Sequence, residues 1–245
     1  MQIIISPAKK MIVDQDSFSP SEEPAFLKQT ETILQKMKQL SYDETKKLWR
    51  TSDKLAQENY QQLQGMDLHQ QLTPAILSYS GIQYQYMAPD ILTRSALGYL
   101  QKTLRIISGF YGILRPFDGI VPYRLEMGAR LQINKNKDLY SFWGDKLYIA
   151  LKNNGPIINL ASKEYSKAIT PYLQKSDQFI EIVFAHLIDG KLRTRATPAK
   201  MARGEMVRFM AENKIVTLDG IKDFPSPTYS FDEKRSSAKK LIFVH

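Results

Sequence analysis

The segment Ile107–Met127, with the sequence ISGFYGILRPFDGIVPYRLEM, constrains the fold of this chain most strongly. Its glycines and prolines recur so closely that no long helix can form across it. Its aromatic and basic residues are also unusual for a passive surface loop. We therefore expect a stiff, turn-rich segment that follows a strand at residues 104–108.

Two roles are open for the arginines of this segment. Arg115 and Arg124, held on stiff turns, suit the recognition of phosphate or carboxylate, because the planar guanidinium loses little freedom when it binds. They can equally pair with Asp118 and Glu126 and hold a buried loop together. The residues by themselves leave both roles open.

Secondary structure is predicted on both sides of this segment. We expect strands at residues 2–6, 75–80, 104–108, 156–161, 179–188, 191–196 and 240–244. We expect helices at residues 23–40, 41–50, 52–63, 89–102, 140–152, 162–173 and 197–214. Residues 134–138 are expected to form a surface loop.

Local motifs support several of these boundaries. Ser41 with Glu44 predicts a capping box, and Asp189-Gly190 predicts a hairpin turn. Thr197 is predicted as an N-cap, with Pro198 at the first helical position. Because strands and helices do not alternate regularly, the predicted fold class is α+β. We expect a single mixed α/β domain over residues 1–245, with a mostly helical N-terminal portion and a basic cleft.

Composition excludes several classes of function. The chain has no cysteine, which rules out disulfides, thiolate metal sites and peroxidatic thiols. His69, His186 and His245 lie too far apart in sequence to show a metal-ligand spacing, so we expect no metal site and no cofactor. No apolar run approaches the roughly 18 residues that cross a bilayer. A cytoplasmic protein without a membrane partner is therefore expected.

The charge balance favours an anionic partner. The net charge is +9 and the isoelectric point is about 9.5. Between residues 191 and 210 there are six lysines or arginines and one acid. Lys191, Arg193 and Arg195 alternate along a predicted strand, so they share one face. Nucleic acid and phosphorylated small molecules both fit this pattern.

Two short motifs place cations where an anion can bind. Lys9 and Lys10 of the SPAKK motif directly follow the first predicted strand, where backbone N–H groups are free. Lys200 and Arg203 lie one turn apart near a predicted helix start, where a lysine opposes the helix dipole. Each motif also fits an ordinary solvated surface.

A third motif lies between two predicted helices. Arg50 and Lys54 flank Ser52-Asp53, and a short helical pair of this kind can offer amide groups to a DNA phosphate. The glycine-containing hairpin typical of such a motif is missing, so an ordinary helical pair is the simpler interpretation.

Six motifs together show a resemblance to a known family. They are, in order, SPAKK (6–10), RTSDKLAQEN (50–59), SGFYGILRPFDGIVPYRLEMG (108–128), LYSFWGD (139–145), INLASKEY (158–165) and AKMARG (199–204). The chain resembles the YaaA family of bacterial peroxide stress proteins from residue 3 to about residue 244. The FYGILRP and PYRLEM blocks are the most specific part of the match.

The resemblance implies properties that composition does not show. It implies a cytosolic protein linked to lowering free iron during peroxide stress, and associated with DNA binding and recombinational repair. It also implies a mixed α/β fold with a positively charged cleft and a helix-hairpin-helix element, and no established reaction. The basic residues within or beside the matched motifs, which we expect to line the cleft, are Lys9, Lys10, Arg50, Lys54, Arg115, Arg124, Lys200 and Arg203.

This chain departs from the family pattern at two places. It has Lys10-Met11 where Thr-Leu is expected after SPAK, and Met201 where a second lysine is expected. Both departures fall within motifs that supply basic residues. They alter the cationic content expected of the cleft and leave the expected fold unchanged.

Three functions follow as hypotheses. The first is a DNA-binding stress protein that contacts phosphates of double-stranded or branched DNA with weak sequence specificity, which predicts strong salt dependence. The second is an enzyme acting on a phosphorylated or nucleotide substrate, with Arg115 and Arg124 as a clamp and Asp118 or Glu126 as acid or base. Iron storage is disfavoured because no Glu-x-x-His pattern occurs. The sequence does not determine an oligomeric state.

The first hypothesis carries a geometric prediction. Lys9, Arg115, Arg124 and Lys200 lie on separate motifs, each next to a turn or a helix start. Brought together, they would form one groove in which their potentials add. We therefore expect these four side chains to line a common groove.

Overall fold

The computed structural model describes residues 1–14, 16–152 and 154–245. Its helices are α1 Leu27–Lys38, α2 Tyr42–Trp49, α3 Asp53–Gln64, α4 Ala75–Ser78, α5 Ile82–Met87, η1 Pro89–Ile91, α6 Arg94–Thr103, α7 Leu139–Trp143, α8 Lys146–Leu151, α9 Lys163–Ser166, η2 Thr170–Tyr172, α10 Ala196–Glu212, α11 Leu218–Lys222 and η3 Glu233–Arg235. Its strands are β1 Gln2–Ile5, β2 Lys10–Met11, β3 Thr73–Pro74, β4 Tyr79–Ser80, β5 Leu104–Ser108, β6 Gly112–Leu114, β7 Gly119–Ile120, β8 Ile157–Asn159, β9 Phe179–Ile188, β10 Lys191–Arg193, β11 Ser230–Phe231 and β12 Lys240–Val244.

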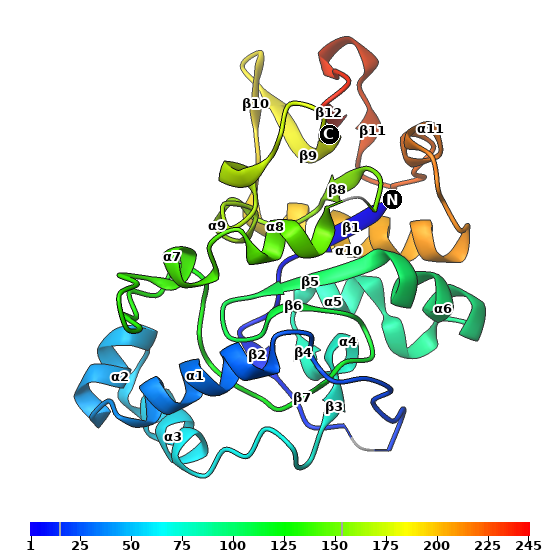
Figure 1. Ribbon diagram of the computed structural model, residues 1–245. Helices are drawn as coiled ribbons and strands as arrows, with labels where there is room; N and C mark the ends of the chain where they lie inside the picture. The colour runs from blue at the N-terminus through cyan, green and yellow to red at the C-terminus, as the bar shows by residue number, and fades with distance from the viewer. Residues whose placement is uncertain (15, 153) are drawn as a thin grey trace.

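A mixed sheet forms the centre of the molecule (Figure 1). Its strand order is β11-β12-β9-β8-β1-β5-β6, and β10 pairs with β9. The inner strands β12, β9, β8, β1 and β5 run parallel to one another, whereas β6, β10 and β11 pair antiparallel. Parallel strands are buried on both faces, which explains why every residue of β1 and β8 is buried and why isoleucine predominates in both.

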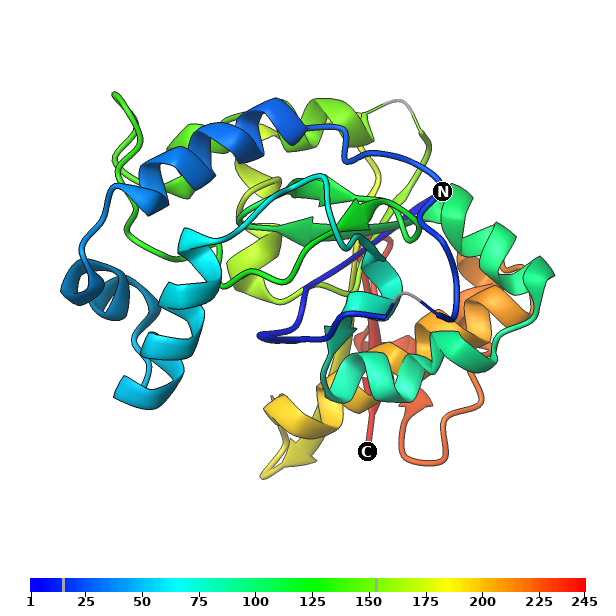
Figure 2. The same cartoon turned by 90° about the horizontal axis from the view of Figure 1, so that it is seen from below.

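Helices cover both faces of this sheet (Figure 2). On one face α10 packs along α5 and α6, and it also contacts β9. On the other face lie α1 and α8, with α8 packed on β6. The large side chains of Trp143, Tyr111, Phe110 and Phe184 are fully buried between these layers.

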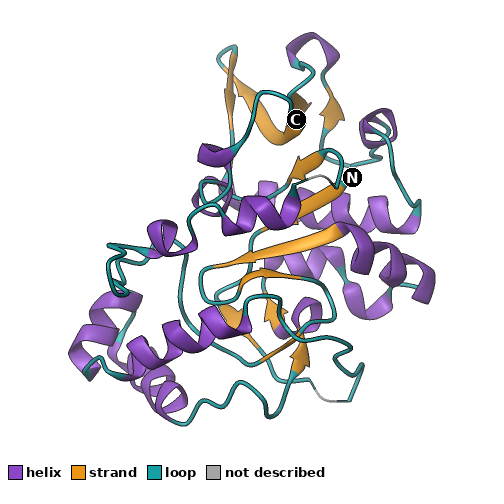
Figure 3. Ribbon diagram, in the orientation of Figure 1, coloured by secondary structure: helices purple, strands orange, loops and turns teal. Residues whose placement is uncertain are grey.

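The N-terminal portion is mostly helical after β1. Helices α1, α2 and α3 gather at one end of the molecule, beside the sheet (Figure 3). The predicted capping box is present at the start of α2, where the Ser41 side chain accepts from the Glu44 N–H and the Glu44 carboxylate accepts from the Ser41 N–H. The mixed sheet and these helices confirm the predicted α+β class.

The strand predicted at residues 75–80 is wrong for residues 75–78 and confirmed only at residues 79–80. The segment forms helix α4 and then the two-residue strand β4, which pairs with β2. All four residues of α4 are buried, so the run lacks the alternation that distinguishes a strand from a helix. The N–H groups of Ala75 and Ile76 donate to the carbonyls of Asp118 and Pro116. Contacts with the Gly/Pro segment, remote in sequence, therefore decide the conformation.

Two predicted helices have different boundaries. The helix expected at 140–152 is divided into α7 and α8 by Gly144, whose φ of +53° is incompatible with a continuous right-handed helix. Helix α10 begins at Ala196, so Arg195 rather than Thr197 is the N-cap, and Pro198 is its third residue. Proline is tolerated there because the first helical N–H groups have no intrahelical partner.

Other predictions differ mainly at element ends. The helices expected at 89–102 and 162–173 each begin or end as a short 3-10 turn, η1 or η2. The β9–β10 hairpin has the expected turn, with φ of +51° at Asp189 and +71° at Gly190. Strand β10 is shorter than predicted and ends at Arg193. Helices α5 and α11 have no counterpart among the predictions.

Candidate anion-binding site

A cavity of about 430 Å³ lies where β1 and β8 end, and we call it the strand-end cavity. It is lined by residues 6–10, 80–84 and 123–126 and by Ser162, Glu164, Tyr165, Lys200 and Arg203. The chain continues from β1 to β5 on one side of the sheet centre, and from β8 to β9 on the other. Crevices at such a switch point, outside the carboxyl ends of parallel strands, are the usual ligand sites of open sheets.

Hydrogen bonds tie together the loops that follow these two strands. The Ser162 N–H donates to Ser6 Oγ at 2.9 Å, and the two hydroxyl oxygens are 3.3 Å apart. The Tyr84 hydroxyl, from α5, donates to the Ser6 carbonyl at 3.0 Å. The SPAKK loop is therefore held on two sides, and it carries Lys9 and Lys10 at the edge of the cavity.

The PYRLEM segment is anchored beside this loop. The Tyr123 hydroxyl lies 2.6 Å from Ser108 Oγ and 2.7 Å from the Tyr79 hydroxyl. A side chain on Gly109 would place its Cβ 2.8 Å from the Leu125 carbonyl oxygen. Only glycine lets the two backbones pass so closely. Both contacts fix the position of Arg124, between Tyr123 and Leu125.

Helix α10 supplies the third group of cations. A Cβ on Gly204 would lie 2.2 Å from the Gln83 carbonyl oxygen, so α10 crosses α5 in backbone contact. This close crossing brings Lys200 and Arg203 to the same cavity as Gln83. The glycine of the AKMARG motif thus explains how residues far apart in sequence meet here.

The cavity lining is predominantly cationic. Its five lysines and arginines are Lys9, Lys10, Arg124, Lys200 and Arg203. The lining also contains two carboxylates, Glu126 and Glu164. Lys9 Nζ lies 3.2 Å from Glu126 Oε1, and Arg124 Nη2 lies 3.9 Å from the same oxygen. The Glu164 carboxylate accepts from the Gly128 N–H at 2.9 Å.

Three buried nitrogen donors of this lining are unused. Among the described residues, Arg203 Nε, Arg124 Nε and Gln83 Nε2 have no hydrogen-bond partner. The Arg124 side chain is only 14% exposed, and Gln83 is 7% exposed. Burial lowers the pKa of the Arg203 guanidinium, and Glu181 acts in the opposite direction. Buried donors without partners cost about 1–3 kcal/mol each, so their convergence on one cavity indicates a site for an acceptor-rich ligand.

Tyrosines form much of the remaining wall. Burial raises the pKa of Tyr84 and of Tyr165 well above the usual range, and it raises the pKa of Tyr123 to about 12. These hydroxyls stay neutral at physiological pH. They add no negative charge to oppose an anion in the cavity.

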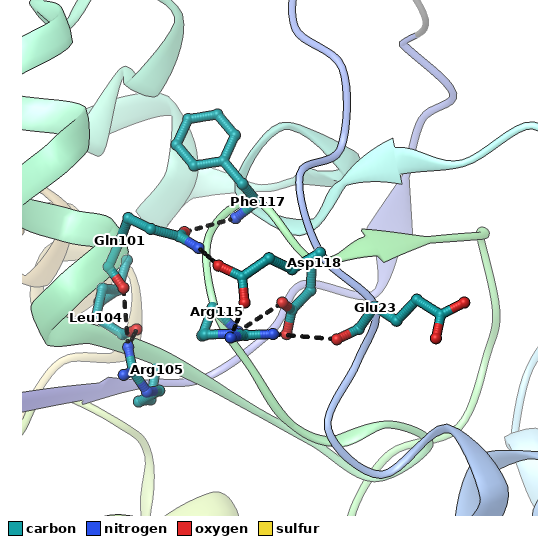
Figure 4. Close-up of polar contacts among 8 residues, drawn as sticks. Glu23, Gln101, Leu104, Arg105, Arg115, Phe117 and Asp118 are labelled. Atoms are coloured by element: carbon teal, nitrogen blue, oxygen red, sulfur yellow. Dashed lines mark hydrogen bonds and ion pairs between the residues drawn. The ribbon is translucent and has the colours of Figure 1, made fainter.

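Arg115 lies outside this cavity, in an ion-pair network (Figure 4). Its Nε donates to Asp118 Oδ1 at 2.9 Å, its Nη2 donates to the Glu23 carbonyl at 3.1 Å, and its Nη1 pairs with Glu22. The network joins the turn after β6 to the segment before α1. The expectation that Arg115 shares a groove with Lys9, Arg124 and Lys200 is therefore wrong, whereas those three residues do line one cavity.

Asp118 serves the same network. Its side chain is completely buried and accepts from both the backbone N–H and the guanidinium of Arg115. Burial raises the pKa of Asp118, and the bonds from Arg115 oppose this rise. A carboxylate so enclosed cannot reach a substrate in the strand-end cavity. Of the two acids considered for catalysis, only Glu126 lines it.

Arg50 and Lys54 lie on the α2–α3 helical pair. Arg50 is the C-cap of α2, with a left-handed φ of +48°, and it lines a separate cavity with Arg130. Lys54 is exposed in the first turn of α3. Lys46 forms an ion pair with Asp53 across the turn. The structure therefore divides the eight predicted residues among the strand-end cavity, the Arg115 network and this helical pair.

The basic strand predicted before α10 is exposed. Lys191 and Arg193 of β10, and Arg195 after it, are all exposed at the surface. They lead directly into α10, which carries Lys200 and Arg203. An exposed cationic stretch thus adjoins the cavity lining.

Sequence reasoning did not bring Ser6 of the SPAKK motif together with Ser162, and it missed Gln83. Ser6 and Ser162 each follow a buried apolar strand, and assuming that these strands are parallel neighbours would have placed both at one sheet edge. Gln83 lies on α5, a helix that the sequence did not predict. A single glutamine in an aromatic segment carries no pattern that marks it as functional.

Two other features are absent from the described part of the chain. Over these residues, no helix is both long and apolar enough to cross a membrane. Within the same residues, no three His, Cys, Asp or Glu side chains are grouped as metal ligands.

Comparison with known proteins gives a consistent match. A family model described as peroxide stress protein YaaA matches residues 1–235. A UPF0246 protein of Lactiplantibacillus plantarum is 61% identical over 246 residues, covering 100% of this chain and 99% of its own length. UPF0246 proteins of Pediococcus pentosaceus and Lacticaseibacillus paracasei are 57% and 56% identical, each covering 100% of this chain, with 98% and 99% of their own lengths aligned.

Proposed function

Because this chain belongs to the peroxide stress protein YaaA family and so has a role in peroxide stress, we propose that it is a cytoplasmic DNA-binding protein. In this proposal the strand-end cavity is the basic cleft, and it binds DNA phosphates. By binding DNA in this way, the protein limits iron-linked oxidative damage to that DNA. Contacts to phosphates fix position without reading bases, so sequence specificity is weak.

One observation carries the proposal. Lys9, Arg124 and Arg203 come from three remote segments, yet they converge on one cavity, where the Nε atoms of both arginines have no partner among the described residues. A phosphate oxygen is the acceptor that a guanidinium binds best. Water could also satisfy such donors, but it would leave the surplus of positive charge uncompensated.

Two further features of the chain can add contacts to DNA. The exposed Lys191, Arg193 and Arg195 continue from α10, and they can follow a DNA backbone beyond the cavity. The α2–α3 pair, with Arg50 and Lys54, is the candidate for the helix-hairpin-helix contact that the family resemblance implies. Both would contribute sequence-independent affinity.

A salt titration of DNA binding tests the proposal. Each phosphate contact contributes about 0.9 to the slope of log K against log salt for duplex DNA. Lys200→Gln should reduce that slope by about one contact and weaken binding equally for unrelated sequences. Lys175→Gln is the matched control, because Lys175 is exposed and outside the cavity lining, and it should leave the slope unchanged.

Two results would contradict DNA binding at this site. The first is no binding of the wild-type protein at low salt. The second is a slope that is the same for wild type, Lys200→Gln and Lys175→Gln, which would place the contacts elsewhere.

One observation favours a second function, that of an enzyme acting on a phosphorylated or nucleotide substrate. Glu126 lies in the cavity beside Lys9 and Arg124, so a carboxylate is available as an acid or base next to an anion site. Conversion of a nucleotide or DNA substrate by the wild-type protein, lost in Glu126→Gln with binding retained, would establish it. Binding without any turnover would leave DNA binding as the function.

A further inference from the structure

We propose that the strand-end cavity receives the terminal phosphomonoester of a DNA strand. This inference rests on the proposed DNA-binding function and narrows it, because it names the part of the DNA that enters the cavity. Four features of the molecule support it: the depth of the donors, the charge of the lining, the size of the cavity and the cations outside the cavity.

The depth of the donors in the cavity excludes the internal phosphates of an intact duplex from reaching them. Gln83 is 7% exposed, and the Arg124 side chain is 14% exposed. Gln83 Nε2 and Arg124 Nε are buried and have no hydrogen-bond partner among the described residues. Duplex DNA is stiff over about 50 nm, and its phosphates lie along the outside of the helix. Such a rod cannot lower a backbone phosphate to donors at this depth. A strand end has no continuing chain on one side, so it can enter.

The net charge of the cavity lining favours a phosphomonoester over a phosphodiester as the ligand. The five cations of the lining exceed its two carboxylates, Glu126 and Glu164, by three charges. A phosphomonoester carries about −1.5 to −2 at neutral pH and presents three acceptor oxygens. An internal diester carries one charge and two free oxygens. The three unused donors, on Gln83, Arg124 and Arg203, match the three oxygens of the monoester.

The size of the cavity fits a terminal nucleotide. Its volume of about 430 Å³ falls in the range of about 300–1,000 Å³ that holds small ligands. The neutral rings of Tyr84, Tyr123 and Tyr165 and the side chain of Leu125 supply a wall for a sugar or base. Aromatic side chains tolerate any base, because every base has a flat face.

Cations outside the cavity favour a strand over a free nucleotide. Lys191, Arg193 and Arg195 are exposed along the stretch that leads into α10. A mononucleotide in the cavity would not reach them, whereas the strand behind a terminal phosphate carries one charge per nucleotide past the cavity edge. The shared ligand chemistry is a phosphomonoester, and the length of its carrier distinguishes the two sources.

The test compares duplexes that differ only at their ends. Fluorescence anisotropy is measured for one sequence with 5′-phosphate, 3′-phosphate or hydroxyl ends, and for a covalently closed dumbbell without ends. At least one phosphorylated duplex should bind about tenfold tighter than the hydroxyl duplex and the dumbbell, a ratio equivalent to about 1.4 kcal/mol. Deoxyadenosine 5′-monophosphate, as competitor, should be at least about a hundredfold weaker than the phosphorylated duplex.

Variants assign the preference to the cavity. Gln83→Leu removes a buried donor at nearly constant volume, and Arg124→Lys removes the guanidinium fork while keeping its charge. Each should reduce the phosphorylated-to-hydroxyl ratio several-fold. Lys175→Gln should keep the full ratio. A thermal melt of each variant confirms that it is folded.

The outcomes separate this inference from the proposed function. Equal binding of phosphorylated, hydroxyl and closed duplexes overturns the terminal-phosphate inference and leaves DNA binding intact. A full ratio in both cavity variants also overturns it. If the mononucleotide competes as strongly as the phosphorylated duplex, the cavity is a small-molecule site, and the terminal-phosphate inference is overturned as well. Failure of every duplex to bind overturns the inference together with the proposed function.

Discussion

Replacing Arg203 with methionine is expected to stabilise the free protein and to weaken its binding to DNA. The Arg203 Nε is buried without a partner within the described ranges of the chain, and burial lowers the pKa of its guanidinium. Folding therefore desolvates a charged group without returning all of its hydrogen bonds. Methionine fills a similar space with an adaptable apolar chain and has no such penalty.

The magnitude follows from the lost penalty. An unsatisfied buried donor costs about 1–3 kcal/mol, so the free energy of unfolding should rise by about that amount. For a chain of this size, each kcal/mol corresponds to a rise in Tm of roughly 2–4 °C. The neighbouring Glu181 does not become an isolated charge, because Lys240 Nζ lies 3.2 Å from its carboxylate.

Thermal and urea unfolding with and without a DNA duplex measure both effects. Wild-type protein should gain stability from the ligand by mass action, and Arg203→Met should gain much less. Arg208→Met is the matched control on α10, because Arg208 forms an exposed ion pair with Glu212 at 2.8 Å. Removing that pair should change stability by no more than about 0.5 kcal/mol. A lower Tm of Arg203→Met without DNA, together with unchanged DNA affinity, would refute the reasoning.

Three other perturbations separate fold from binding. Arg115→Met should lower the free energy of unfolding by about 3–5 kcal/mol, because it leaves the buried Asp118 carboxylate without its guanidinium partner. The DNA affinity of this variant, measured well below its Tm, should match that of wild type. A selective loss of affinity would contradict the structural role of Arg115. Gly204→Ala forces α10 away from the Gln83 carbonyl, so it should reduce both stability and DNA binding. Gly98→Ala is the control, because no described atom lies within 4 Å of the added Cβ, and it should raise stability by about 0.5–1 kcal/mol. Burial, Arg195 and His245 lower the pKa of His186, whose ring lies 3.2 Å from the Tyr229 hydroxyl. The unfolded chain therefore binds the proton more readily, so stability should fall as pH drops from the ordinary histidine pKa of 6.5 through the lower pKa of the folded state. In a pH series of urea melts, His186→Gln should flatten this part of the stability profile.

Local residue patterns were sufficient to predict many elements of this fold. The capping box at Ser41, the Asp189-Gly190 turn and the closing strand β12 all occur as their residues indicate. The capping box and the turn depend on interactions within a few residues, so neighbours in sequence decide them. Strand β12 also depends on pairing with β9, which is remote in sequence. The α+β class followed from the irregular order of predicted strands and helices, and the family followed from six motifs in their order along the chain.

Tertiary structure decided which cations meet. Lys9, Arg124 and Lys200 carry no sequence mark that separates them from Arg115, yet three of these four line the cavity and one holds a loop. Their positions depend on parallel pairing of β1 with β8 and on the close crossing of α10 over α5 at Gly204. The conformation of α4 likewise depends on remote carbonyl groups. The sequence alone determined the hairpin turn, the capping box and the cationic motifs. Contacts between distant segments decided the partners of the cations, because an arginine pairs with whichever acceptor the completed fold brings within reach.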